Sequence, residues 1–247
     1  MAPPESQRLP RATPVLLALE TATTFGSVAL VAGDRCVAEY SLQSPLTHSR
    51  RLLAGVEWIM QESGSRWEDI DGIAVSLGPG SFTGLRIGLS TVKGLVLATG
   101  KPLLGVGTLD GLAGQFRQAC HLVCPVLDAR KKEVYTAFYR SDAHGVCQRL
   151  SEYLVLPPEA FCAMLTEPVI LVGDGAEVYG ELFQERLAGR VSIAPASIYF
   201  PRAAAIGMLA VAKWRRQEFL DASTTVPVYI RPSEAELLFP KAGSPSG

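Results

Sequence analysis

The sequence predicts a two-lobed α/β protein built from a duplicated unit, and three observations support this. The chain opens with an antiparallel meander of short apolar runs, and a second hairpin pattern begins near Val123. An acidic residue ends the first strand of each half, Glu20 in one and Asp128 in the other. Each half also contains a strand, a glycine turn and a helix, around 76–80 and 172–176. Identities between the halves are few, so the repeat is inferred from the order of the elements.

The first lobe is expected to span 15–110. Ser81 or Thr83 can cap a helix, and Gly100 follows the end of that helix as a C-terminal glycine does. The turn at 33–34 is a hairpin signal. The expected strands, taken from short apolar or alternating runs, are 15–20, 27–32, 36–42, 70–77 and 103–106. The expected helices are 47–63, capped by Thr47 or Ser49, then 83–99 and 109–119.

The second lobe is expected to span 111–231. Its first two strands form a hairpin, and Pro157-Pro158 opens a helix because proline fits the first helical turn. The expected strands are 123–127, 133–139, 146–156 and 169–172, and the expected helices are 158–165, 174–187 and 202–219. The Pro-rich, polar residues 1–14 predict a flexible leader, and 232–247 predict a tail.

The composition argues against several classes of protein. The 247 residues are 48% hydrophobic, which is enough for a substantial core, and the formal net charge is −1. A protein that binds nucleic acid directly usually carries a basic excess, because phosphate contacts dominate the affinity. No apolar run is long enough to span a membrane. Five scattered cysteines without a Cys-x-x-Cys pair predict reduced thiols in a cytoplasmic protein.

Four stretches of the chain resemble the TsaB (YeaZ) family. The most specific is 78–91, which opens Gly-Pro-Gly-Ser-Phe-Thr-Gly-Leu-Arg-Ile-Gly and is followed by Lys93-Gly94. The others are 17–30, 127–135 and 227–236. The resemblance implies the actin/Hsp70/sugar-kinase (ASKHA) fold, which agrees with the duplicated order of elements.

The resemblance also implies a role in tRNA modification. TsaB-like proteins pair with TsaD, the catalytic subunit, which transfers threonylcarbamoyl from threonylcarbamoyl-AMP to N6 of the adenosine beside the anticodon. They also work with the ATPase TsaE. The implied role is a non-catalytic scaffold or dimerization subunit of this N6-threonylcarbamoyladenosine (t6A) complex, with no cofactor of its own. ATP or ADP would bind at a subunit interface, and tRNA would be contacted only indirectly.

The histidines agree with a chain that holds no catalytic metal. Such a site needs about three protein ligands, but His48, His121 and His144 are far apart in the sequence. TsaD-like subunits carry a paired-histidine metal motif on the first helix, where this chain has only His48. No catalytic residue is therefore expected.

The helix at 83–99 is apolar on most of its sides, so it needs cover on most of its sides. One sheet covers about half of a helix. A partner chain would supply the rest, unless the helix is packed inside one chain. The resemblance implies pairing through this helix and the helix at 47–63, where Trp58 is either an interface anchor or is shielded by its own chain. The uncovered face also predicts a homodimer when TsaD is absent. The expected partner residues are Trp58, Gly84, Ile87, Gly88, Thr91, Leu95 and Ala98.

Six residues are candidates for nucleotide contact. Glu20 and Asp128 lie where nucleotide-using relatives of this fold carry carboxylates, but neither is followed by the glycine found in those relatives. Alternatively, both acids bond to hairpin backbone, and 173–175 is a plain turn with Asp174 as a helix cap. The turn at 78–84 either holds phosphate or only brings its helix close to the sheet. The six candidates are Glu20, Thr21, Asp128, Gly173, Asp174 and Gly175.

Two other functions stay open on the sequence. The first is a small-molecule kinase or ATPase of the same fold, which the missing glycines oppose. The second is a peptidase that acts on a partner protein. A peptidase would need a base beside Ser81 or Ser90, and no Gly-x-Ser-x-Gly motif occurs.

Overall fold

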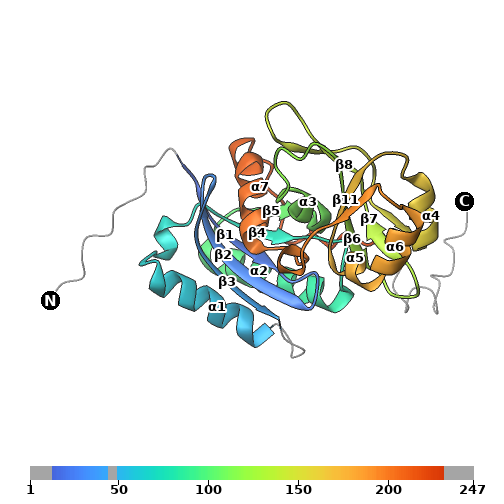
Figure 1. Ribbon diagram of the computed structural model, residues 1–247. Helices are drawn as coiled ribbons and strands as arrows, with labels where there is room; N and C mark the ends of the chain where they lie inside the picture. The colour runs from blue at the N-terminus through green and yellow to red at the C-terminus, as the bar shows by residue number, and fades with distance from the viewer. Residues whose placement is uncertain (1–12, 44–48, 231–247) are drawn as a thin grey trace, which may run out of the picture.

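The computed structural model describes residues 13–43 and 49–230, and it shows two β-sheets that are each covered by helices (Figure 1). The expected tail at 232–247 lies outside the described residues, as do the expected leader up to residue 12, Thr47 and His48. The first sheet occupies the left half of the view in Figure 1, and the second sheet occupies the right half.

The first sheet has five strands in the order β3-β2-β1-β4-β5. β1 pairs antiparallel with β2 and parallel with β4. Every residue of β1 is buried, as expected for a strand that is covered on both faces. The strands are β1 (Val15–Glu20), β2 (Phe25–Ala32), β3 (Arg35–Gln43), β4 (Gly72–Ser76) and β5 (Leu103–Val106).

The second sheet repeats this topology. β6 takes the place of β1, because it pairs antiparallel with β7 and parallel with β11. The main order is β10-β7-β6-β11-β12, and β8 and β9 pair beside it. The repeat confirms the duplicated, two-lobed α/β fold. The strands are β6 (Leu122–Asp128), β7 (Val134–Thr136), β8 (Tyr139–Ser141), β9 (Cys147–Arg149), β10 (Leu154–Leu156), β11 (Val169–Val172) and β12 (Val191–Ile193).

A side-chain hydrogen bond and a left-handed glycine fix the two ends of helix α2 (Phe82–Thr99). The Ser81 Oγ accepts a bond from the Gly84 amide at 3.2 Å, and Gly100 is left-handed at φ 67°, so both expected ends of α2 are confirmed. Short 3-10 turns occupy Trp67–Asp69 and Ala196–Ile198. The helices are α1 (Ser49–Glu62), α2 (Phe82–Thr99), α3 (Thr108–Ala113), α4 (Pro158–Met164), α5 (Asp174–Val178), α6 (Gly180–Arg186) and α7 (Ala203–Arg215). In the described part of the chain, no helix has the length and apolar character needed to cross a bilayer.

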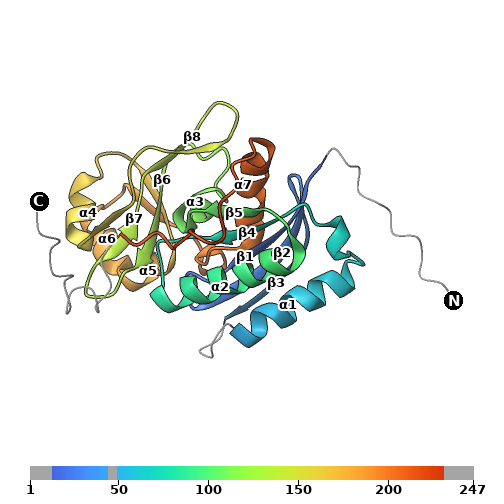
Figure 2. The same cartoon turned by 180° about the vertical axis from the view of Figure 1, so that it is seen from behind.

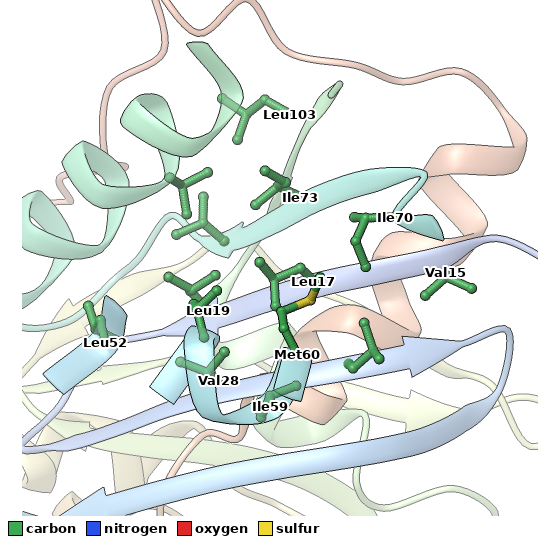
Figure 3. Close-up of a cluster of buried hydrophobic side chains, with 14 of the residues drawn as sticks. Val15, Leu17, Leu19, Val28, Leu52, Ile59, Met60, Ile70, Ile73 and Leu103 are labelled. Carbon is green, nitrogen blue, oxygen red and sulfur yellow. The ribbon is translucent and has the colours of Figure 1, made fainter. Parts of the chain in front are cut away.

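The core of the first lobe lies between its sheet and the helices α1 and α2, which run along the same face (Figure 2). Figure 3 shows Leu52 and Ile59 of α1 in one buried cluster with Leu17 and Leu19 of β1. All four side chains are nearly or fully removed from solvent. Burying a side chain of this size contributes about 1.5–3 kcal/mol, so this cluster fixes both helices on the sheet.

The helix α7 covers the opposite face of the first sheet, although the sequence placed it in the second lobe. The Ser27 Oγ accepts a bond from the Ala203 amide at 2.7 Å. Glu39 of β3 accepts a bond from the Ala204 amide at 3.0 Å. Gly207 lies so close to the sheet that a Cβ there would be 2.7 Å from the side chain of Val31. Apolar side chains of α7 form one buried cluster with β1, β2, β4 and β5.

Several elements from residue 108 onward are shorter than the sequence predicted. The single strand expected at 133–139 is two strands, β7 and β8, and the strand expected at 146–156 is β9 and β10. The helix expected at 174–187 is broken at Tyr179 between α5 and α6. The helix expected at 109–119 ends at Ala113, and the one expected to reach Phe219 ends at Arg215. Strand β12 was not predicted, because three residues give too short a pattern.

Candidate functional site

The two glycines in the first half of α2 face their own chain. A Cβ on Gly84 would be 2.0 Å from the carbonyl oxygen of Thr21, and a Cβ on Gly88 would be 2.2 Å from the Thr21 Oγ1. That hydroxyl donates to the carbonyl oxygen of Gly84 at 2.9 Å. The expectation that Gly84 and Gly88 admit a partner helix is therefore wrong. They let α2 lie directly on the turn that follows β1.

Ile87, Thr91 and Leu95 lie on the same side of α2 as the two glycines and are partly buried, and Ile87 and Leu95 pack against the core of the first lobe. Ala98 is exposed, and Leu97 lies on the side of the helix opposite the glycines. Leu97 is 88% exposed, the highest value among the exposed large apolar side chains of the described residues. The sequence analysis missed Leu97. The signal for it is a leucine on the side of the helix that also carries Arg86 and Ser90, where a polar residue is expected.

The neighbouring helix α1 also exposes apolar side chains. Trp58 is 47% exposed, and its ring lies 6.0 Å from the ring of Tyr40 on β3. Its own chain therefore shields part of Trp58, and its role as an interface anchor stays a prediction. Leu53, five residues earlier on α1, is 51% exposed. We call the surface of these two helices the α1–α2 face, which comprises the exposed Leu53, Trp58, Leu97 and Ala98 and the partly buried Ile87, Thr91 and Leu95.

The nucleotide candidates of the first lobe are buried. Glu20 and Thr21 have no exposed surface. The Glu20 Oε1 accepts a bond from the Ala22 amide at 2.5 Å, so this acid bonds to hairpin backbone. Burial raises the pKa of Glu20 to about 7 against the smaller opposing effect of the Ala22 bond. A carboxyl group in this position does not reach a phosphate or a metal ion in solvent.

The candidates of the second lobe also contact their own turns. The Asp128 Oδ1 accepts a bond from the Arg130 amide at 2.9 Å, and its Oδ2 lies 3.1 Å from the Arg130 guanidinium. Asp174 is not the cap of α5, which is Gly173. The Asp174 Oδ1 instead accepts a bond from the Asp128 amide at 3.0 Å. Burial, with a smaller effect from the Asp128 charge, raises the pKa of Asp174.

The glycines beside Asp174 lie against backbone and not against open space. A Cβ on Gly173 would be 2.2 Å from the carbonyl oxygen of Val126, and one on Gly175 would be 3.0 Å from the Asp128 amide nitrogen. The six candidate residues thus all contact their own chain, and nucleotide contact through them stays a prediction. A nucleotide held jointly with a partner stays a prediction. Among the described residues, no three His, Cys, Asp or Glu side chains gather as metal ligands would.

Comparisons with known proteins decide the family. A family model described as TsaD, tRNA N6-adenosine threonylcarbamoyltransferase, matches residues 44–239. The tRNA threonylcarbamoyladenosine biosynthesis protein TsaB of Escherichia coli is 33% identical over 221 residues, which are 87% of this chain and 94% of that protein. The Bacillus subtilis TsaB is 29% identical over 224 residues, 90% of this chain and 96% of that one. The chain belongs to the TsaB (YeaZ) family.

Solved structures agree with this assignment. YeaZ from Pseudomonas aeruginosa superposes with a TM-score of 0.76 and 34% identity, covering 88% of this chain and all of that one. The ethanolamine utilization protein EutJ from Carboxydothermus hydrogenoformans has a TM-score of 0.51 at 12% identity, covering 82% of this chain and 92% of that one. The second likeness concerns the fold alone, which is the ASKHA fold. This TsaB-family chain is therefore a t6A biosynthesis protein.

The packing of α2 on Thr21 predicts opposite effects for two glycine substitutions. Gly88→Ala should lower the free energy of unfolding by about 1–2 kcal/mol, because overpacking outweighs the better helix propensity of alanine. Gly94→Ala is the matched control. It has nothing within 4 Å and should gain up to about 1 kcal/mol. Urea unfolding measures both, and equal stability of the two variants would contradict the contact.

The buried Glu20 predicts a pH dependence of stability. The folded chain holds this proton up to about pH 7, whereas the unfolded chain releases it near the ordinary glutamate pKa of 4.5. The stabilisation is therefore complete below about pH 4.5 and is lost as the pH rises through 7. Glu20→Gln removes this dependence. Between pH 5 and 8 the wild type should lose on the order of 3 kcal/mol more than the variant in chemical unfolding. Parallel pH profiles would disprove the burial argument.

Proposed function

We propose that this chain is a non-catalytic scaffold subunit of a t6A-forming complex, and that it binds a TsaD-like transferase through the α1–α2 face. The observation that carries the proposal is Leu97, a large apolar side chain left 88% exposed on a helix whose other side is buried. Exposed apolar clusters on a folded protein mark docking surfaces. On α1, Leu53 and Trp58 are also large apolar side chains about half exposed, at 51% and 47%.

The chemistry of the chain supports a role without catalysis. The acids Glu20, Asp128 and Asp174 bond to backbone of their own chain. The Ser81 hydroxyl, which a peptidase would need as a nucleophile, caps α2. The reaction itself, transfer of threonylcarbamoyl to tRNA adenosine, then belongs to the TsaD-like subunit, with a TsaE-like ATPase as the further partner. The net charge of −1 favours indirect contact with tRNA.

The match to a transferase family supports the choice of partner. The chain is 31% identical over 121 residues to the tRNA N6-adenosine threonylcarbamoyltransferase of Erythrobacter litoralis, which covers 42% of this chain and 35% of that protein. Two related chains that share a fold can present equivalent faces to each other, as the two halves of a dimer do. A homodimer through the same face is the state proposed when the transferase is absent.

Reconstitution tests the proposed role. The transferase and ATPase subunits of the same organism are mixed with tRNA, ATP and threonylcarbamoyl-AMP, with and without this chain. Threonylcarbamoylated tRNA should accumulate only when the chain is present. The isolated chain should hydrolyse no ATP. Full activity without the chain, or rapid ATP turnover by the isolated chain, would overturn the scaffold proposal.

Leu97→Asp separates binding from folding. The side chain is almost fully exposed, so the melting temperature should not change, whereas affinity for the transferase subunit should fall at least about tenfold, because a charge is buried at the interface. Leu150→Asp is the matched control, since Leu150 is 56% exposed outside this face. Calorimetric titration measures both variants. Equal affinity of Leu97→Asp and the control would place the interface elsewhere.

A further inference from the structure

The outward side of α2 carries positive charge only. Arg86 and Lys93 are seven residues apart, so they lie on one line along the helix, two turns from each other. The helix contains no acidic residue. Neither side chain forms an ion pair within residues 13–43 and 49–230. Leu97 continues the line one turn beyond Lys93, and Phe82 begins it one turn before Arg86. We call Phe82, Arg86, Lys93 and Leu97 the cationic line.

Arg86 is held in place by its own chain. Its guanidinium carbon lies 3.8 Å from the centre of the Phe82 ring. Its Nε donates to the Tyr229 hydroxyl at 3.0 Å. Tyr229 is fixed in turn, because its ring packs 5.0 Å from the ring of Phe82 and the Val228 amide donates to the carbonyl oxygen of Leu77 at 2.7 Å. An arginine that is already ordered loses less entropy when its remaining N–H groups bind a partner.

We propose that the cationic line recognises a helix of a different chain that carries carboxylates along its facing side. The inference rests on the proposed function and specifies what the transferase must present there. The free N–H groups of Arg86 suit a carboxylate, and Lys93 adds a second point charge two turns away. Leu97, at the end of the line, supplies the apolar contact.

The same line makes a second copy of this chain a weaker partner than a helix that carries carboxylates. A two-fold pair that sets α2 against α2 places Arg86 and Lys93 opposite positive charges of the other copy. Specificity is a difference between affinities, so this repulsion adds to the attraction for an acidic partner. The exposed acids of α1, Glu57 and Glu62, would meet the line only if α1 packs on α2 of the other copy. Charge reversal would then weaken the homodimer too.

Charge reversal tests the proposal on the full chain. We compare the double variant R86E/K93E and the single variant K93E with the wild type. K93E leaves the contacts of Arg86 with Phe82 and Tyr229 intact. Arg117 and Arg186 are exposed outside the α1–α2 face, so R117E/R186E makes the same change of net charge as a control. Titration calorimetry at 50 and 300 mM NaCl measures affinity for the transferase subunit, and analytical ultracentrifugation measures self-association.

The expected result is a loss of at least about tenfold in affinity for R86E/K93E at 50 mM NaCl, a smaller loss for K93E and no loss for the control. Wild-type affinity should fall with salt more steeply than that of the double variant, and self-association should not weaken. If the wild type binds and both variants bind equally well, the inference fails while the scaffold role stands. Weaker self-association of the double variant would also overturn it. If the wild type does not bind the transferase subunit, the proposed function fails as well.

Discussion

The contact between α2 and the turn after β1 decides how the first lobe presents its surface. Because Gly84 and Gly88 have no side chain, the helix lies directly on Thr21, and larger residues would collide with that backbone and hydroxyl. This contact, together with the apolar cluster beneath α1 and α2, leaves the other side of α2 turned outward. The exposed Leu97 and the cationic line are consequences of that placement. A helix lifted or rotated on the sheet would present a different face.

The carboxyl groups at the ends of β1 and β6 and at the start of α5 stabilise turns of their own chain. Glu20 and Asp128 each bond to backbone two residues further on, and Asp174 bonds to the backbone of Asp128. These bonds stabilise the turns that follow β1 and β6. In the proposed scaffold role, the duplicated fold supports the α1–α2 face.

Much of the fold was predictable from local patterns, because strands such as 15–20 and caps such as Ser81 depend on nearby residues. The second lobe was harder, since its strands change neighbours within a few residues and three-residue strands leave no periodicity. The position of α7 depends on Ser27 and Glu39, which lie more than 160 residues away in sequence. At the site, the pattern of α2 indicated an open side, but it could not show that the glycines face Thr21, because only the packed structure brings the turn beneath them.

The most direct test of the account is a structure of this chain bound to the transferase subunit of the same organism, in which the exposed fraction of Leu97 is measured. We expect this side chain, 88% exposed in the free chain, to be buried against a helix of the transferase, with carboxylates facing Arg86 and Lys93. A complex in which Leu97 and the rest of the α1–α2 face stay in solvent would contradict the account.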